Sequence, residues 1–486
     1  MSVNLSKSKY LSGLQCVKKL WLEINDQQKA APFSIAQQRI LNQGTEVGIL
    51  ARQQLPGGIL INFDRFDLKK GIIETQNAIS GGASVIYEAT FLYDDTYALA
   101  DIIIKNKDTS WDIIEVKSTL SVKDFHYPDL ALQKYVLEGN GIEIKKTCLM
   151  HLNSECVHPD LYNLFVIEDV TEKIDEFIRN VDPNISAFKQ IISIQDEPDV
   201  AIGPQCKDPY ECAFKEYCWE FAGDKAVFDI PGLYKDKKVI LQDRGILTLE
   251  QLPHDFPLPE NQWEYVYRIL NKDIRIDTNR IREKLKELEY PIHFLDFETD
   301  NPAIPRHTGM SPYDNFPFQY SCHVLYENDQ LSHYEYLQTD KSDPRRPLIE
   351  SLLKCIDRKG SIVVYSASFE KGVLRQLSES FQEYRSQIDS MIERLWDQLV
   401  IFRNYYKHYA FGNSNSLKSV LPVVVPELNY QVLEIQGGAD AQAVWNEMIK
   451  EEDTQKKDKM ITELKKYCGM DTLAMVKIHN MLQKVI

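Results

Sequence analysis

The chain lacks the long apolar runs that membrane proteins and secreted precursors contain. Within its 486 residues, no stretch approaches the ~18 to 20 apolar residues of a membrane span. The first residues, MSVNLSKSKYLSGLQC, have no continuous apolar run of the kind found in a secretory signal. We therefore expect a cytoplasmic protein without a membrane partner.

The chain also lacks an excess of positive charge. Its 72 acidic and 56 basic residues give a formal net charge of −16. A protein that coats nucleic acid without sequence preference normally presents a basic surface, so this composition argues against that class. A nuclease is still compatible, because carboxylates that hold divalent cations add to the negative total while the metal supplies local positive charge.

Internal repeats and low-complexity tracts are missing, and the length exceeds that of one ordinary domain. With 43% apolar residues and interspersed charge, the chain reads as globular, with two or three cores. The composition changes near residue 226, and a new strand pattern begins at 291. We expect a first domain over 1–222, a small helical connector over 223–289 and a second domain over 290–486.

Strand and helix patterns alternate along the chain, which predicts the α/β class. In the first domain, three β-rich segments separated by Asp-Asp and Lys-Asp turn signals indicate an antiparallel meander, and a further strand is expected at 147–152. The meander strands are expected over 84–93, 96–106 and 110–119. Helices are expected over 6–23, 42–55 and 124–141.

The secondary-structure pattern is weak in the connector and strong in the second domain. Residues 240–253 have the helix, glycine turn and helix character of hairpins that bind the DNA backbone, although a plain linker fits as well. Residues 291–300 form an apolar run typical of a buried strand. Further strands are expected over 318–329, 330–339 and 361–367.

Nine cysteines in a chain without a secretion signal indicate thiols or metal ligands rather than disulfides. Cys206, Cys212 and Cys218 lie together in PQCKDPYECAFKEYCWE, and Cys16 lies far upstream. Four thiolates suit an iron-sulfur cluster, and a zinc site is physically possible too. The simplest alternative is a set of unrelated buried thiols.

A first candidate site lies in the predicted meander. Asp101 follows one apolar strand segment, and Glu115 and Lys117 lie two apart on the next strand, hence on one face. Carboxylate oxygens suit Mg²⁺ or Mn²⁺, and Lys117 can position a nucleophile or stabilise charge. Gln133 and Tyr135 on the following helix are candidates for contact with the substrate backbone. An isolated Glu-x-Lys pair is more often just a solvated strand face.

In combination, these motifs resemble the RecB-like branch of the PD-(D/E)xK nucleases, including CRISPR-associated members with an iron-sulfur cluster. The resemblance implies a restriction-endonuclease-like core in which Asp101 and Glu115 bind metal and Lys117 is catalytic. The family's Gln-x-x-x-Tyr motif corresponds to Gln133 and Tyr135, here two apart. Where relatives place a metal-binding His, this chain has Gly48, with Glu46 and Glu88 as alternative carboxylates.

The cysteines extend this resemblance, because the iron-sulfur relatives place one Cys before the nuclease core and three after it. Cys16 followed by Cys206, Cys212 and Cys218 has this distribution. The resemblance implies a [4Fe-4S] cluster that clasps the first helix to the end of the domain, so its role would be structural.

A second candidate site begins at Asp296 and Glu298, which share one face of a buried strand. Carboxylates there are costly without metal or partners. Tyr467 and Asp471 lie four apart in a predicted helix and share a face. With Glu370 and Asp397, these motifs resemble the DnaQ-like, RNase-H-fold 3′–5′ exonucleases.

This second resemblance implies a two-metal clamp held by four carboxylates, in which Tyr467 orients the attacking water. Glu370 stands where an Asp is usual, which lengthens one ligand by a methylene. An RNase-H-like module without catalysis is the alternative for this domain.

The ordered combination of all these segments resembles a bacterial family of predicted nucleases whose C-terminal half is a domain of unknown function. Ser416 and Lys418 match that family's pattern and are candidates for contact with substrate phosphates. We expect a metal-dependent deoxyribonuclease acting on single strands or DNA ends, with a helicase or another DNA-processing protein as a possible partner. The alternatives are a nucleic-acid-binding scaffold with degenerate sites and an exonuclease directed at RNA.

Overall fold

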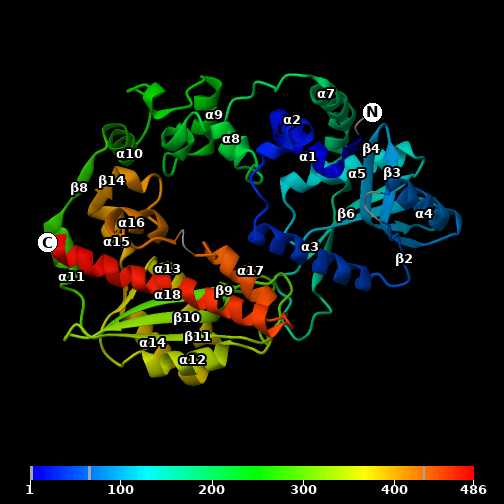
Figure 1. The fold of residues 1–486 in the computed structure, drawn as a ribbon. Coiled ribbons are helices and arrows are strands. Elements are labelled where there is room, and N and C mark those ends of the chain that lie inside the picture. The colour runs from blue at the N-terminus through cyan, green and yellow to red at the C-terminus, as the bar shows by residue number, and fades with distance from the viewer. Residues whose placement is uncertain (1–3, 64–66, 431–432, 486) are drawn as a thin grey trace.

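The computed structural model describes residues 4–63, 67–430 and 433–485 and has a mixed α/β architecture (Figure 1). Two large sheets and a two-stranded ribbon are joined by helices. In these described ranges, no helix is both long and apolar enough to cross a membrane. The α/β class expected from the sequence is confirmed.

The first sheet has seven strands in the order β2-β3-β4-β5-β6-β7, with β1 beside β4. The β3, β4 and β5 strands run antiparallel, which confirms the predicted meander. The β5 and β6 strands are parallel, so the helix between them crosses over the sheet. The bounds are β1 (Leu5–Ser6), β2 (Ile59–Leu60), β3 (Val85–Tyr93), β4 (Thr96–Lys105), β5 (Trp111–Val116), β6 (Ile144–Leu152) and β7 (Phe165–Asp169).

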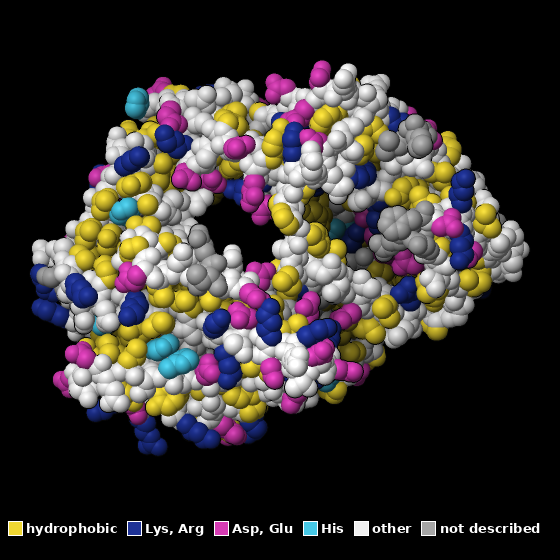
Figure 2. Space-filling model, in the orientation of Figure 1, with side chains coloured by type: hydrophobic (Ala, Val, Ile, Leu, Met, Phe, Trp, Pro, Cys, Tyr) yellow, Lys and Arg dark blue, Asp and Glu magenta, His cyan; other side chains and the backbone are white. Residues whose placement is uncertain are grey.

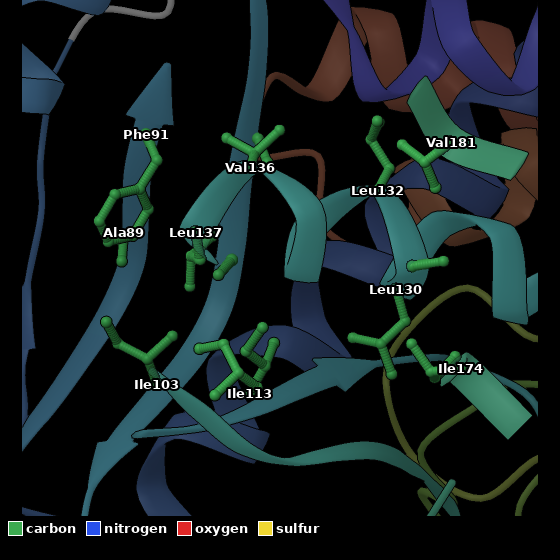
Figure 3. Close-up of a cluster of buried hydrophobic side chains, with 14 of the residues drawn as sticks. Ala89, Phe91, Ile103, Ile113, Leu130, Leu132, Val136, Leu137, Ile174 and Val181 are labelled. Carbon is green, nitrogen blue, oxygen red and sulfur yellow. The ribbon is translucent and has the colours of Figure 1, made fainter. Parts of the chain in front are cut away.

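The crossover helix, α5 (Tyr127–Gly139), forms the centre of the first core. In Figure 3, Leu130 and Leu137 of α5 lie among side chains from the strands, including Ile103 and Ile113. All four side chains are fully buried, and each contributes about 1.5–3 kcal/mol through removal from water. Surrounding helices are α4 (Leu68–Ser80), α6 (Thr171–Phe177) and α7 (Val181–Ser193).

The first helical segment differs from the sequence prediction. Instead of one helix over 6–23, α1 (Lys7–Gln15) and α2 (Val17–Asn25) are separated at Cys16. Cys16 adopts an extended conformation with φ −166° and ψ 122°, and this break turns the chain between the two helices. The next helix, α3 (Ile35–Gln54), starts earlier than the predicted residue 42, because Ser34 and Gln37 form a capping box.

The connector has a hydrophobic core of its own, which extends from Ile202 to Ile269. The predicted second helix of the 240–253 hairpin is wrong: after α9 ends and Gly245 turns the chain with φ +67°, only a 3₁₀ turn follows at Leu249–Gln251. The helices here are α8 (Lys215–Trp219), α9 (Lys235–Asp243), α10 (Glu260–Asn271) and α11 (Thr278–Leu285). The short strand β8 (Ile274–Ile276) pairs with β14 (Tyr406–His408).

The second sheet has five strands in the order β11-β10-β9-β12-β13. The β9, β10 and β11 strands are antiparallel, whereas β12 and β13 continue parallel to β9. The buried strand and the strand pair predicted from the sequence are confirmed. The bounds are β9 (Ile292–Asp300), β10 (Phe316–Leu325), β11 (Leu331–Leu337), β12 (Ile362–Val364) and β13 (Leu395–Asp397).

The long helix α18 (Thr454–Val485) runs along this sheet and contacts β9 and β10 (Figure 1). The helices α12 and α14 lie on the other side of the sheet in the same view. The remaining bounds are α12 (Arg345–Cys355), α13 (Ala367–Ser380), α14 (Arg385–Glu393), α15 (Leu399–Asn404), α16 (Leu417–Val424) and α17 (Gly438–Met448).

The two large domains touch directly as well as through the connector. Arg39 of α3 donates to Asp300 at the end of β9 over 2.6 Å, and α3 packs against α17. The Tyr313 hydroxyl donates to the carbonyl of Ser118, directly after Lys117. These contacts close the chain on itself, and Figure 2 shows an opening through the molecule. In Figure 1 it is bordered by α8, α16, α17 and the segment between α2 and α3.

Candidate functional site

The second carboxylate set converges on one cavity. Asp296 and Glu298 come from β9, and Tyr467 and Asp471 come from α18, which crosses the same face of the sheet. All four line a cavity of about 680 Å³. Residues that are about 170 positions apart in the sequence therefore meet because α18 packs on β9, as the sequence analysis expected.

Ligand atoms within this set are close enough to bind one cation. One atom each from Asp296, Glu298 and Cys468 lies within 4.8 Å of the others, and this is the one such group among the described residues. The Sγ atom of Cys468 lies 3.9 Å from Oδ2 of Asp296. The sequence analysis missed Cys468, although it directly follows Tyr467.

The carboxyl groups are held where a negative charge is unfavourable. Burial, together with the nearby Asp471 and Glu298 carboxylates, raises the pKa of Asp296 well above its ordinary value. Burial and the Asp471 charge raise the pKa of Glu298 to about 8. Burial also raises the pKa of Asp471 to about 6. A divalent cation would remove the mutual repulsion, so the donor set fits Mg²⁺ or Mn²⁺.

Two tyrosines and a lysine form the polar wall beside these carboxylates. The Tyr430 hydroxyl donates to Oδ1 of Asp471 and thereby fixes its orientation. Nζ of Lys418 donates to the Tyr467 hydroxyl over 3.1 Å and lies 5.0 Å from the centre of that ring. Tyr430 was missed because nothing in its local sequence signals a contact with a helix 41 residues downstream.

The other residues expected in this site have different roles in the structure. Glu370 is buried on α13, and burial raises its pKa to about 8. The negative charge of Glu370 also helps to raise the pKa of Asp296. Asp397 accepts from the backbone N–H groups of Ser366 and Leu399, each over 3.0 Å, so it fixes a turn. Ser416 lines the cavity and caps α16.

The first carboxylate set also comes together. Nζ of Lys117 donates to Oε1 of Glu115 over 2.7 Å, and Nε2 of Gln133 donates to the other oxygen of Glu115 over 2.7 Å. Oδ2 of Asp101 accepts from the backbone N–H of Val116 over 2.8 Å. The meander register places Asp101 beside Glu115, as the sequence analysis expected.

Two residues of this cluster were missed. Asp129 of α5 accepts from Lys117 over 2.6 Å and from Gln133 over 3.0 Å. Nζ of Lys7, at the start of α1, lies 2.8 Å from Glu115 and 3.4 Å from Asp129. Asp129 precedes Gln133 by one helical turn, so its position was readable from the sequence. Lys7 had no such local signal.

The electrostatics of this cluster differ from those of the second site. Burial opposes the charge of Lys7, but Asp129 and Glu115 outweigh it and raise the pKa of Lys7 well above its ordinary value. Burial and Glu115 raise the pKa of Asp101 to about 8. Two ammonium groups therefore offset the charges of Glu115 and Asp129 in the first cluster, whereas in the second site the carboxylates raise one another's pKa.

Three further residues considered for the first site lie elsewhere or at its edge. The Tyr135 hydroxyl donates to Asp182 over 3.1 Å and is not brought to the cluster. Glu46 lies 3.5 Å from Lys450 of the second domain. Glu88 lines a cavity of about 290 Å³ together with Asp101 and Lys7, so it is the alternative carboxylate that the structure places near the cluster.

The four cysteines gather at one place. Cys16, at the break between α1 and α2, and Cys206, Cys212 and Cys218 line one cavity of about 20 Å³. Burial raises the pKa of Cys218 to about 11. A tetrahedral zinc site would hold the sulfurs about 3.8 Å apart. Among the described residues, no three of these thiols lie within 4.8 Å of one another.

Part of the chain is similar to a described domain family and to two proteins of Mycoplasma. Residues 293–416 match a family described as a domain of unknown function, DUF2779. The chain is 26% identical over 234 residues to the uncharacterized protein MG366 of Mycoplasma genitalium, covering 43% of this chain and 34% of that protein. It is 28% identical over 226 residues to the MG366 homolog of Mycoplasma pneumoniae, covering 42% and 33%.

The matched region thus spans about a third of the length of these two relatives. A solved structure described as the crystal structure of SSO0001 covers 45% of this chain and 86% of its own, with 13% identity and a TM-score of 0.24. A likeness at that score carries no argument. The family match begins three residues before Asp296 and includes Glu298 and Glu370.

Manganese is expected to stabilise the folded chain most at high pH. The raised pKa of Glu298 means that the folded chain holds a proton that the unfolded chain releases between its ordinary value of 4.5 and about 8. The stabilisation of the folded chain by this proton on Glu298 is present at low pH and is lost as the pH rises from about 4.5 to about 8. Excess Mn²⁺ should raise Tm by on the order of 5 °C at about pH 8 and by less at about pH 6.

The measurement is thermal unfolding with Mn²⁺ or EDTA. Asp296→Asn should lose most of the manganese shift, whereas Glu393→Gln, on an exposed position of α14, should keep it. Equal shifts in the two variants would contradict a cation site at β9.

Lys7 is expected to hold the first cluster together. Lys7→Met leaves the buried Glu115 and Asp129 carboxylates with one ammonium group fewer, which should cost about 3 kcal/mol of unfolding free energy. Urea denaturation near neutral pH measures this loss. Lys70→Met, which removes a surface pair with Glu74, should cost less than about 0.5 kcal/mol. If both variants lost the same amount, the cluster would not depend on Lys7.

Proposed function

We propose that the chain is a metal-dependent nuclease whose hydrolytic centre is the second carboxylate set. The observation that supports this most is the group of Asp296, Glu298 and Cys468, with ligand atoms within 4.8 Å, whose two carboxylates line a cavity of about 680 Å³. A cavity of this size admits a polymer end, and its acidic wall needs a cation before a phosphate can approach.

Both folds expected from the resemblances have topological support. In the second sheet, three antiparallel strands continue into two parallel ones, an order that fits an RNase-H-like domain. In the first sheet, an antiparallel meander leads through α5 into a parallel strand, which fits a PD-(D/E)xK core. Asp296 and Glu298 lie on the first strand of the second sheet, where the DnaQ-like motif requires them.

The donor set fits a divalent cation held by Asp296 and Glu298, with Asp471 on the wall of the same cavity. Such an ion, when bound, polarises a phosphodiester and activates water. The chain's own groups do the rest: Tyr430 holds Asp471 in place, and the Lys418 ammonium lies beside the Tyr467 hydroxyl over the cavity. Lys418 can therefore pair with a phosphate oxygen, and Tyr467 can hold a water against the scissile phosphate.

The first carboxylate set supports a secondary role in this proposal. Its buried carboxylates are paired with Lys7 and Lys117, so a metal ion would have to displace an ammonium group. This pairing favours a structural or nucleic-acid-binding function for the first domain over hydrolysis in the resting state. The four cysteines fit a [4Fe-4S] cluster that ties the α1–α2 break to the segment carrying Cys206, Cys212 and Cys218.

The nuclease proposal predicts metal-dependent cleavage of labelled oligonucleotides. With Mg²⁺ or Mn²⁺, the wild type should shorten single-stranded DNA, and Asp296→Asn and Asp471→Asn should lose at least about a thousandfold in rate because the cation site is lost. Lys117→Ala should retain most of the rate, because Lys117 belongs to the neutralised cluster. Glu393→Gln is the control.

Substrates labelled at the 5′ or the 3′ end show the direction of cleavage. Matched RNA and duplex substrates show which polymer the chain prefers. Faster cleavage of RNA would replace DNA by RNA as substrate. Binding without any turnover would leave the scaffold alternative. If Asp296→Asn cleaved as fast as the wild type while Lys117→Ala did not, the hydrolytic centre would be the first site.

The cluster proposal predicts that protein purified without oxygen is brown and carries about four irons per chain. Cys212→Ser should lose the colour and most of the iron, whereas Cys148→Ser, at a buried cysteine of β6, should keep both. Iron analysis and visible absorbance are the measurements. Colourless protein with stoichiometric zinc would overturn the iron assignment.

A further inference from the structure

A second polar cavity lies between the connector and the second domain. It has a volume of about 480 Å³ and is lined by residues of α10 and β8 on one side and of α15 and β14 on the other. Its walls carry three cations and two carboxylates, from Arg268, Arg275, Lys407, Glu264 and Asp277. No motif in the sequence analysis drew on these residues.

Two of these cations are placed directly against each other. In the antiparallel ribbon of β8 and β14, Arg275 is the cross-strand partner of Lys407. Like charges at directly opposed positions destabilise a strand pair, and a ribbon of two three-residue strands has little stability to spare. An anion between the two side chains would convert this repulsion into attraction.

The third cation is held in the wall without a matching acceptor. Arg268 lies near the end of α10, with its guanidinium 5.6 Å from the centre of the Tyr265 ring. Its Nε atom is buried and has no hydrogen-bond partner. Burial lowers the pKa of Arg268. A buried guanidinium nitrogen left unpaired is costly, and the side chain also lines the cavity, so an anion there would offset the charge that Arg268 holds in the wall.

The acidic residues nearby do not neutralise all three cations. Arg275 forms ion pairs with Asp273 over 2.8 Å and with Glu264 over 3.7 Å. Asp277 accepts from the backbone N–H of Arg280 and caps α11. In the part of the chain that the structure describes, neither Arg268 nor Lys407 forms an ion pair with a carboxylate within 4.0 Å. The burial and positive neighbours of Lys407 lower its pKa as well.

This cavity adjoins the proposed hydrolytic centre. The helix α15 separates the two: Arg403 lines the cavity of Asp296, and Asn404 and Tyr405 line the cationic cavity. The two cavities therefore share the C-terminal end of α15. A single strand that runs from Asp296 past this end of the helix would carry its backbone phosphates toward Arg268 and Lys407.

We propose that this cavity binds a backbone phosphodiester of the single strand whose end lies at Asp296. Arg268 and Lys407 provide the positive charge, and because phosphates are the same at every base, the contact is independent of sequence. This assignment of the phosphate's source rests on the proposed nuclease function. The cavity itself, with its opposed cations and unpaired Arg268 nitrogen, does not depend on that function.

The test measures binding without turnover. Fluorescence anisotropy in EDTA should show that Arg268→Gln and Lys407→Gln each bind a labelled single-stranded 12-mer about five- to tenfold more weakly, with a salt dependence reduced by about one counterion. A labelled nucleoside, which carries no phosphate, should bind no more weakly to these variants than to the wild type. Arg280→Gln, an exposed residue of α11 paired with Glu283, is the matched control.

Two results would overturn the proposal. One is unchanged 12-mer binding in both variants, with Tm values that show them folded. The other is thermal stabilisation by inorganic phosphate that Arg268→Gln abolishes while 12-mer binding stays intact, which would assign the cavity to free phosphate. Weaker 12-mer binding by Arg268→Gln and Lys407→Gln, together with a wild type that cleaves nothing, would support the cavity and overturn only the proposed hydrolysis.

Discussion

The arrangement of the two domains depends on one buried carboxylate, Asp300. Its side chain is fully buried at the end of β9 and is held by Arg39 from α3 over 2.6 Å and by Arg306 over 3.3 Å. A buried carboxylate left without its partners costs several kcal/mol, so the first domain must stay docked for β9 to keep its native end. Glu298 lies two residues before Asp300 and on the same strand, so docking also fixes the position of a candidate cation ligand.

The two carboxylate clusters show two solutions to the same physical problem. Burying several acidic groups together is unfavourable unless protons, internal cations or metal ions reduce their charge. The first cluster uses the ammonium groups of Lys7 and Lys117. In the second, burial and mutual repulsion raise the pKa values of Asp296 and Glu298, and no ammonium group pairs with these carboxylates among the described residues, so this cluster relies on protons or on a cation from solution. This difference in pairing is why we propose hydrolysis at the second cluster.

The sequence predicted the strands and the helix that carry both carboxylate sets, because their patterns are local. A period of two placed Asp296 beside Glu298, a helical period placed Tyr467 beside Asp471, and turn signals predicted the meander that joins Asp101 to Glu115. The partners that complete both sites come from far away: Lys7 meets Glu115 across 108 residues, and Arg39 meets Asp300 across 261. No periodicity reports such contacts, because they depend on how helices pack on a sheet. The break at Cys16 was missed because its flanks have helical character on both sides.

The strongly acidic composition is compatible with a phosphate-binding protein because acidic and basic side chains gather in different cavities. Asp296, Glu298 and Asp471 line one cavity, while Arg268 and Lys407 line another across α15. An acidic wall repels a polyanion until a cation is bound, whereas a cationic wall attracts it in every state. A strand held first by the cations would approach the carboxylates only when metal is present. The −16 net charge then limits nonspecific binding elsewhere on the surface without weakening the path to the site.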